Sequence, residues 1–355
     1  MADEVSIYEC ACGSQLPAQL LSCPGCGRLV HTERLKELVT DANRARQRRD
    51  FSGQASALRN ALDLLPADSR QHGVIRGRIA ELSEMIDAGF SPEARAPAAN
   101  ASPGTTRPRH ALLKAGSAAG LIAILLWKFK FILVFIATKA KLLLLGLSKS
   151  TTLFTMLLSL GVYWAAWGWQ FGLGVVLSIY VHEMGHVAAL RKFGIRATAP
   201  MFLPGLGAIV RLHQYPQTPR EDARVGLAGP LWGLGASIAT LAIYYVTQLP
   251  VIAAIATVGA WINLFNLLPV WQLDGARGFR SLSRRQRWIA LATIAATWMI
   301  AQEGLLVLLG IGAALQCFAK DAPENGDARG LLSYAGLVIS LALLSGIPVP
   351  EAVPP

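Results

Sequence analysis

The sequence predicts an all-α polytopic membrane protein with about six to eight spans, preceded by a small N-terminal domain that is soluble. Three observations support this fold class. The 355 residues are 53% hydrophobic and only 15% charged, which is too apolar for an ordinary soluble protein. The apolar residues are concentrated after residue 110, in runs of about 17–25 residues, the length that crosses a bilayer. The first 110 residues are instead polar and mixed in composition.

The charges are divided unevenly between the two parts of the chain. Residues 1–110 carry 14 Lys and Arg against 13 Asp and Glu, whereas the remainder carries 19 against 9. The cations of the second part stand beside apolar runs, in "RKFGIR" (191–196) and "RGFRSLSRRQR" (277–287). This is the positive-inside pattern, which places both segments on the cytoplasmic side of a membrane. A nucleic-acid-binding protein would carry its basic charge on a soluble face, so we expect no nucleic-acid partner.

The N-terminus is acidic and bears cysteines, and it has no apolar stretch of the kind that defines a signal peptide. We therefore expect the N-terminal domain to be cytoplasmic. The whole chain is then an integral protein of the cell (inner) membrane, in direct contact with the lipid bilayer.

Residues 1–30 are predicted to form a zinc-ribbon-like module. Cys-x-Cys and Cys-x-x-Cys pairs lie ten residues apart and use Cys10, Cys12, Cys23 and Cys26. Four thiolates suit a tetrahedral structural zinc ion, and a module this small would depend on the metal for its folding. A redox dithiol or unligated surface cysteines are the alternatives.

Residues 31–90 show helical spacing of their apolar residues, which predicts a helical hairpin or a tetratricopeptide-like segment. The stretch 51–66 resembles half of such a repeat, and stable arrays need about three repeats, so the plain hairpin is favoured slightly. A cytoplasmic protein partner would bind here. Residues 91–110 are rich in Pro, Ala, Ser and Gly and are expected to form a linker.

Residues 111–350 are predicted to form the membrane-embedded domain. Its expected spans lie near 111–127, 131–147, 152–170, 171–191, 225–247, 251–270, 287–318 and 331–348. The first two are crowded with lysines and are alternatively a hairpin or an interfacial helix. Within 287–318, Glu303 is expected to mark a break between two short spans. Residues 196–212 alternate apolar and small residues, which predicts either a short re-entrant strand or an ordinary loop.

The motif "HEMGH" lies inside the predicted span 171–191. His182 and His186 are four residues apart, so on a helix they share one face and can bind one metal ion. Glu183 lies beside them, where it can take a proton from a metal-activated water. Three ionisable groups on one turn of a membrane helix are costly to bury, which favours a metal site over histidines bonded to neighbouring helices.

A catalytic zinc ion usually takes a third protein ligand. Six of the nine carboxylates after residue 110 lie in predicted loops or the tail, which leaves Glu183, Asp274 and Glu303. Asp274 stands in "NLFNLLPVWQLDGARGF" (263–279), where proline and glycine break the helix, and non-helical backbone at membrane depth normally lines a cavity. Asp274 and the histidines both precede basic segments, so they are expected at the same depth. Asp274 is therefore the predicted third ligand.

These two motifs together resemble the site-2 protease family of intramembrane zinc metalloproteases. "HEMGH" is similar to the family motif that supplies two zinc ligands and the catalytic glutamate. "NLLPVWQLDG" is similar to the motif Asn-x-x-Pro-x-x-x-Leu-Asp-Gly, which supplies the third ligand. The resemblance covers roughly residues 150–285 and includes "LAGP" (227–230). It implies that Asn266 holds substrate or stabilises the oxyanion. The spacer "VWQ" and Ala276 after Gly275 depart from the family pattern.

The resemblance implies an intramembrane zinc endopeptidase. It would cut a membrane-protein substrate in or near a transmembrane segment, with one catalytic zinc ion and a second, structural one in the cysteine module. The alternative is a catalytically silent, membrane-anchored binding or scaffold protein that acts through its N-terminal domain. Loss of Glu183 or of a ligand would have favoured that alternative, and all four residues are present. A metal transporter would need several polar groups along a path rather than acids that converge on one point.

Overall fold

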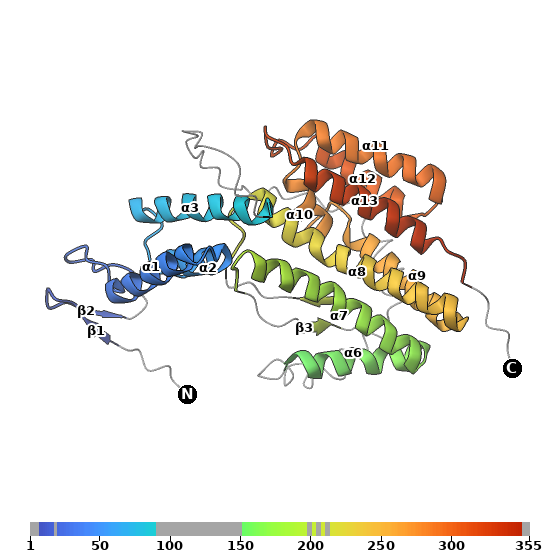
Figure 1. Cartoon of the computed structure of the whole chain (residues 1–355), viewed down its shortest axis with the longest axis horizontal. Helices are drawn as coiled ribbons and strands as arrows, with labels where there is room; N and C mark the ends of the chain where they lie inside the picture. Colours follow the sequence, from blue (N-terminus) through green and yellow to red (C-terminus); the bar gives the residue numbers. More distant parts are fainter. Residues whose placement is uncertain are drawn as a thin grey trace, which may run out of the picture.

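The computed structural model describes residues 7–17, 20–89, 151–196, 201–203, 207–209 and 214–349. Within these residues the chain is mostly helical, with eleven helices and two short hairpins (Figure 1). The predicted mostly helical architecture is confirmed. The predicted spans 111–127 and 131–147 and the linker 91–110 lie outside the described residues.

Eight of the described helices form a bundle after residue 150. They are α6 (Thr151–Trp167), α7 (Trp169–Lys192), α8 (Pro219–Thr247), α9 (Pro250–Asn266), α10 (Asp274–Arg280), α11 (Arg284–Ala301), α12 (Leu305–Cys317) and α13 (Ala328–Ser345). Among the described helices, α7, α8 and α13 are long and apolar enough to cross a membrane, and α6, α9 and α12 are shorter apolar helices. The main hydrophobic core of the bundle lies between α8, α9 and α11–α13.

The predicted span 287–318 is two helices. Helix α11 ends at Gln302, whose φ of 52° is left-handed, and α12 begins three residues later. A left-handed residue ends a helix because it turns the chain out of the helical path. The break therefore lies at Gln302–Gly304 and includes Glu303, as the sequence predicted.

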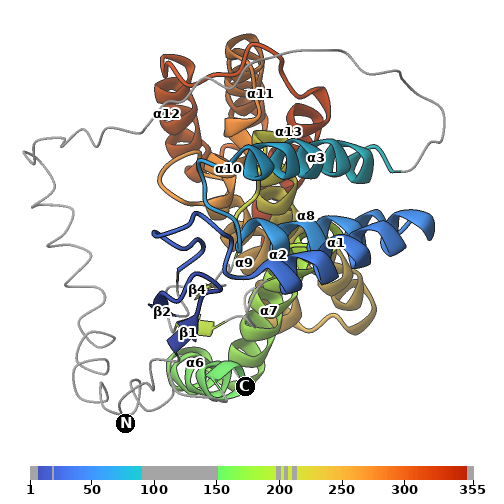
Figure 2. The ribbon, with the colours of Figure 1, turned by 90° about the vertical axis from the view of Figure 1, so that its left-hand side faces the viewer.

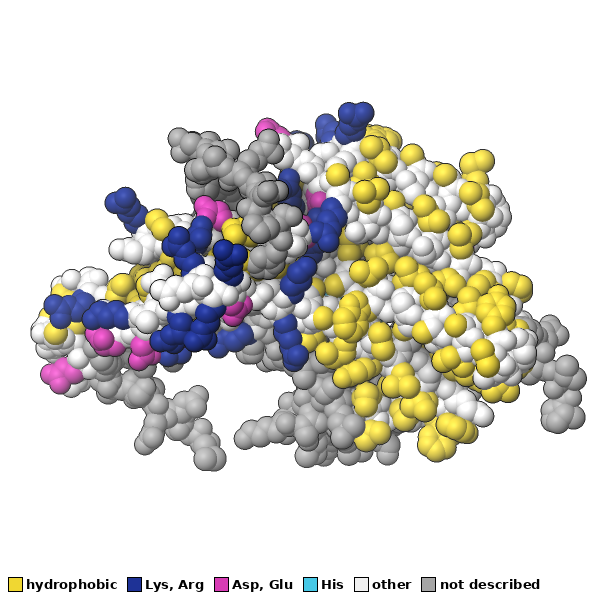
Figure 3. All heavy atoms as spheres, in the orientation of Figure 1, with side chains coloured by type: hydrophobic (Ala, Val, Ile, Leu, Met, Phe, Trp, Pro, Cys, Tyr) yellow, Lys and Arg dark blue, Asp and Glu magenta, His cyan; other side chains and the backbone are white. Residues whose placement is uncertain are grey.

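The surface of the bundle is apolar where lipid would surround it. Large side chains that are more than half exposed include Val246, Trp271, Met299, Ile300 and Leu332. Figure 3 shows that hydrophobic side chains cover one part of the molecule, whereas Lys and Arg gather over the N-terminal part and the boundary between the two. A soluble protein rarely exposes apolar area on this scale, so the distribution supports membrane insertion.

The N-terminal part contains a hairpin and three helices. The hairpin pairs β1 (Ile7–Glu9) with β2 (Gln15–Pro17) in antiparallel register, and the helices are α1 (Thr32–Gln47), α2 (Phe51–Leu62) and α3 (Arg70–Asp87). Asp50 and Ser69 cap α2 and α3 by accepting hydrogen bonds from the backbone amides of Gly53 and His72. Such caps satisfy amides that the first helical turn leaves unpaired.

Helices α1–α3 pack against the basic end of the bundle (Figure 2). Side chains of α2 and α3 share one hydrophobic cluster with Leu190, Phe193 and Ile195 at the end of α7 and with Val225 of α8. The guanidinium of Arg59 forms an ion pair with Glu221 inside this contact, and both side chains are almost fully buried. The N-terminal helices are therefore joined to the helices that carry the predicted site.

The segment after α7 contains a second hairpin. Strand β3 (Met201–Leu203) pairs with β4 (Gly207–Ile209) in antiparallel register, with Phe202 opposite Ala208. The hairpin contacts α6 through β3 and α7 through β4. Of the two alternatives for residues 196–212, the described residues take the strand form.

Candidate metal centre

Helix α7 places both histidines of "HEMGH" inside the bundle. His182 and His186 are buried, and their imidazole Nε2 atoms are 3.1 Å apart. The i, i+4 spacing gives them one helical face. That face is turned toward α8, because a Cβ atom added to Gly229 of α8 would collide with the His186 ring. On α7, a Cβ atom added to Gly185 would collide with the carbonyl of Ala228. The glycine thus allows α7 and α8 to approach closely beside the site.

Asp274 reaches the same point from α10. One carboxylate oxygen, Oδ2, lies 3.2 Å from the Nε2 atom of His182 and 3.2 Å from that of His186. The three ligand atoms therefore form a nearly equilateral triangle. The structure brings together the three residues that the sequence proposed as ligands.

The loop before Asp274 is held by the last two helices. The Tyr334 hydroxyl donates a hydrogen bond of 2.8 Å to the carbonyl of Leu267, and the Gln316 side-chain amide donates one of 3.0 Å to the carbonyl of Pro269. These contacts satisfy buried carbonyls that the broken helix leaves free. Helices α12 and α13 thus hold the loop that leads to the aspartate.

Two further hydrogen bonds orient the histidine rings. The side-chain amide nitrogen of Asn263 donates to the carbonyl of Gly259, so its oxygen faces the Nδ1 atom of His182 at 2.7 Å. The Nδ1 atom of His186 lies 2.8 Å from the carbonyl of Val225. Both partners accept, so both Nδ1 atoms carry the proton and both Nε2 atoms present a lone pair. Fixing the tautomer of a ligating histidine in this way is typical of metal sites.

The geometry fits a tetrahedral zinc ion. Bonds of about 2.0–2.1 Å at tetrahedral angles put ligand atoms about 3.3 Å apart, close to the 3.1 and 3.2 Å of this triangle. Two lone pairs and a carboxylate oxygen at such distances repel one another unless a cation lies between them. Gly229 of α8 leaves room for both histidine rings. A Cβ atom there would collide with the His186 ring and would lie 2.8 Å from the Nε2 atom of His182.

Glu183 and Asn266 differ from the ligands in their placement. Glu183 is buried on α7 within electrostatic reach of the three ligands, but it is not part of the group of atoms that converge. Asn266 is half-buried at the last residue of α9, one turn after Asn263. The roles that the sequence suggested for them, proton transfer and substrate or oxyanion binding, remain proposals.

The four N-terminal cysteines form a second cluster with metal-site geometry. The Sγ atoms of Cys10 and Cys26 are 3.6 Å apart, as are those of Cys12 and Cys23. Zinc–sulfur bonds of about 2.3 Å at tetrahedral angles give a separation of about 3.8 Å. Each pair is followed by a glycine with left-handed backbone, Gly13 (φ 85°) and Gly27 (φ 69°). A residue with a side chain would be strained at these two turns.

The local environment favours a thiolate in this cluster. The hydroxyl of Ser14, 3.3 Å from the Cys12 sulfur, and its backbone amide lower the pKa of Cys12 to about 6. The backbone amide of Arg28 acts in the same direction on Cys26, but hydrogen bonds to the other three thiols raise the pKa of Cys26 to about 11. Four thiolates so close together need a cation, which a structural zinc ion would provide.

Comparison with known proteins identifies the family. Residues 170–253, which include both histidines and Gly229, match Peptidase family M50. This part of the chain is therefore similar to that family. Zinc metalloprotease MJ0392 of Methanocaldococcus jannaschii is 26% identical over 142 residues, which cover 38% of this chain and 40% of that protein. "Putative zinc metalloprotease Rip3" of Mycobacterium tuberculosis is 29% identical over 168 residues, which cover 44% of this chain and 42% of that protein.

The chain spans about two fifths of the length of these two relatives. The family match contains the histidine pair and ends before Asp274. The third ligand therefore rests on the motif around Asp274 and on the geometry of this structure. The resemblance to the site-2 protease family is confirmed, and the match to M50 implies zinc.

Three groups that orient the site were not singled out in the sequence. They are Asn263, Tyr334 and the backbone carbonyl of Val225. A buried polar residue inside an apolar span is a usable signal, and Asn263 gives it in "WINLFN". The carbonyl of Val225 leaves no signal in the sequence, because every residue has a backbone carbonyl.

Replacing Asn263 with Ala is expected to weaken zinc binding by about 10–100-fold, the usual cost of losing a partner that orients a ligand. The His182 ring would lose the acceptor for its Nδ1 proton. Asn266→Ala is the matched control, since it removes the same amide from the same helix and should leave zinc affinity unchanged. Competition with a chelator measures the zinc affinity of both variants. Equal affinities in the two variants would contradict the orienting role of Asn263.

Replacing Cys23 and Cys26 with Ser is expected to remove one zinc ion and unfold the N-terminal ribbon. The ribbon has only a small hydrophobic cluster, formed by Cys10, Leu16 and Cys23 with Val30 beside it, so little else holds it together. The His182 site should keep its own metal, because its ligands lie in the bundle. Zinc analysis of the purified variant tests this, and loss of both ions would show that the two sites depend on each other.

Proposed function

We propose that this protein is an intramembrane zinc endopeptidase that cuts a membrane-protein substrate in or near a transmembrane segment. The observation that carries the proposal is the convergence of His182, His186 and Asp274 beside the buried Glu183, within a bundle of apolar helices. Regulated intramembrane proteolysis, in which cleavage releases a signalling fragment, is the process that this activity would serve.

The residues divide the chemistry among them. His182, His186 and Asp274 would hold a zinc ion, which would supply the Lewis acidity needed to polarise the scissile carbonyl and acidify water. The carboxylate of Glu183 takes a proton from the attacking water as the new C–O bond forms. It then returns that proton to the amide nitrogen as the C–N bond breaks. Asn266 would bind the substrate backbone or the developing oxyanion.

Substrate would reach the site in an extended form. A helical peptide hides its amides in its own hydrogen bonds, so a scissile bond must first unwind. The hairpin β3–β4 lies against α6 and α7, and a two-stranded sheet has free backbone groups along its edges. Strand addition to such an edge would satisfy the substrate backbone and expose its amide.

The positive-inside pattern supports a cytoplasmic position for the basic end of the bundle. Lys192, Arg277 and Arg280 lie at helix ends there, and α1–α3 pack on the same end. The N-terminal domain would then be cytoplasmic, where it could bind a cytoplasmic protein partner. The protein would lie in the cell (inner) membrane.

Replacing Asp274 with Ala tests the metal site directly. We expect zinc content to fall from two ions to one per chain, and cleavage of a single-span reporter tagged at both ends to cease. Glu324→Ala is the matched control, because it removes an exposed carboxylate outside the site.

Unchanged zinc in Asp274→Ala would contradict the ligand set. Full zinc in the wild type without cleavage of any reporter would favour the alternative of a silent scaffold that acts through its N-terminal domain. The two results can be told apart because metal content and cleavage are measured separately.

A further inference from the structure

A groove outside the metal centre lies between α7, α8 and α13. It has a volume of about 580 Å³ and opens on the outside of the bundle. Its floor consists of small and apolar residues, among them Ala188, Ala228 and Leu337, and its rim includes the exposed side chains of Leu231 and Leu332. The groove therefore faces the region where lipid chains would lie.

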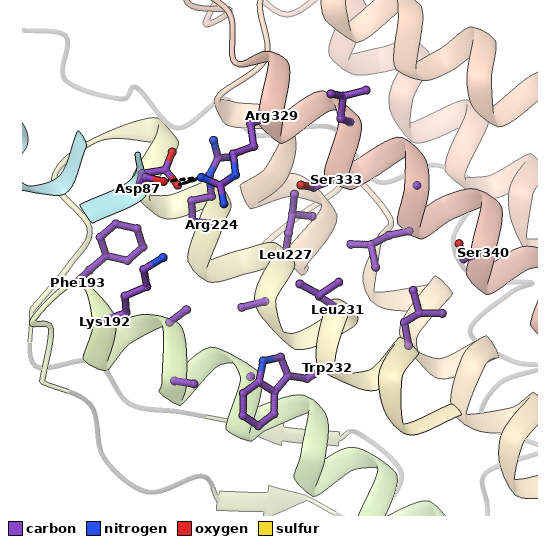
Figure 4. Close-up of a pocket in the computed structure, with 18 residues that line it drawn as sticks. Asp87, Lys192, Phe193, Arg224, Leu227, Leu231, Trp232, Arg329, Ser333 and Ser340 are labelled. Atoms are coloured by element: carbon purple, nitrogen blue, oxygen red, sulfur yellow. Dashed lines mark hydrogen bonds and ion pairs between the residues drawn. The ribbon is translucent and has the colours of Figure 1, made fainter. Parts of the chain in front are cut away.

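One end of this groove is cationic. Figure 4 shows Lys192, Arg224 and Arg329 gathered there with Asp87, whereas Leu231 and Trp232 lie further along. Lys192 is the last residue of α7 and Arg329 the second residue of α13, so both mark the level at which a membrane-crossing helix meets water. Charge and apolar surface are thus arranged along the groove as headgroup and acyl chain are arranged in a phospholipid.

The cations differ in how fully they are neutralised. Arg224 is held by Asp87 at 2.7 Å and by both oxygens of Asp327 at 2.8 and 2.9 Å. Arg329 is 61% exposed and 3.5 Å from the Asp87 carboxylate. Lys192 is exposed, and within the described part of the chain its ammonium pairs with no carboxylate. Lys192 therefore remains available to an anionic ligand. Arg329 pairs with the Asp87 carboxylate and donates to the Asp87 carbonyl, yet most of its side chain is exposed on the same side. Arg224 fixes the position of the carboxylates around both cations.

We propose that this groove binds one anionic phospholipid of the surrounding bilayer, with its phosphate between Lys192 and Arg329 and an acyl chain along Leu231 and Leu332. Basic pockets between membrane helices at the membrane boundary recognise anionic headgroups in this way. A helix 10–12 Å wide would fit only roughly one turn into 580 Å³. A lipid, which needs only the width of a chain, fills such a groove along its length.

Native mass spectrometry of the purified full-length protein in detergent tests the proposal. The protein is titrated with phosphatidylglycerol and, separately, with phosphatidylcholine of the same acyl chains. We expect one phosphatidylglycerol to be retained and phosphatidylcholine to be retained far less. Lys192→Gln with Arg329→Gln should weaken phosphatidylglycerol binding about 30-fold, as expected for the loss of two cations near an anionic headgroup.

The matched control is Arg191→Gln with Arg284→Gln. It removes the same charge from exposed positions at the ends of α7 and α11, outside the groove. Equal weakening by the control would overturn the proposal, because general attraction between a basic protein and an anionic lipid would then explain binding. Equal retention of the two lipids would also overturn it.

A second pair of variants tests the apolar half without changing charge. Gly336 lines the groove and has open space where a Cβ would lie, so Gly336→Leu should fold normally and block the acyl chain. Gly235→Leu makes the same change at an open position of α8 outside the groove. We expect binding to be lost only in Gly336→Leu. Retained binding there, or binding of glycerol phosphate as tight as that of phosphatidylglycerol, would show an anion site with no acyl chain and would overturn the proposal.

Discussion

Glu183→Gln is expected to abolish peptide-bond cleavage while leaving both zinc ions bound. The amide keeps the size of the side chain but can no longer accept the proton from water or return it to the leaving nitrogen. General acid–base groups contribute about 10²–10⁴-fold to rate, so cleavage of the tagged reporter should fall by at least that factor. Because Glu183 is not among the converging ligand atoms, zinc content should not change.

Glu303→Gln is the matched control for this variant. It makes the same chemical change at another carboxylate of the membrane domain, in the break between α11 and α12. Its cleavage rate should match the wild type. Wild-type cleavage in Glu183→Gln would rule out a role in proton transfer, and loss of zinc in that variant would show that Glu183 is a ligand instead.

Arg59→Met is expected to lower the free energy of unfolding by about 3–5 kcal/mol, the cost of leaving one partner of a buried ion pair alone. The side chains of Arg59 and Glu221 are 2% and 0% exposed, so water cannot replace the lost guanidinium. The effect should be concentrated in α1–α3, because this pair lies where they meet α8. Denaturant unfolding in detergent and hydrogen exchange of residues 32–87 measure it.

Arg34→Met is the control on the N-terminal surface. Its ion pair with Glu37 is 60% and 63% exposed, so its removal should cost less than about 1 kcal/mol. Combining Arg59→Met with Glu221→Leu should restore much of the stability, since apolar residues often replace a buried pair at little cost. A loss in Arg59→Met no larger than in Arg34→Met would show that the pair does not hold the N-terminal helices in place.

The docking of the N-terminal helices could not be predicted from the sequence. Helical spacing in residues 31–90 predicts helices, and the structure has three there. Nothing in that spacing shows which face meets the bundle. Arg59 and Glu221 are 162 residues apart. In the sequence, neither residue can be told from an ordinary surface charge. The linker composition indicated a separate unit, whereas the contacts join α2 and α3 to α8.

The sequence by itself determined the features that depend on neighbouring residues. Hydropathy placed α6, α7, α9 and α13 to within about four residues, and α8 begins six residues before its predicted span. The i, i+4 spacing of His182 and His186 put two nitrogens on one helical face. Only the tertiary structure decided that Asn263 and the carbonyl of Val225 orient these rings, from 81 and 39 residues away. The packing of α7, α8 and α13 likewise forms the groove beside Lys192. These contacts depend on how helices pack against one another, and packing depends on side-chain shape across the whole bundle rather than on local periodicity.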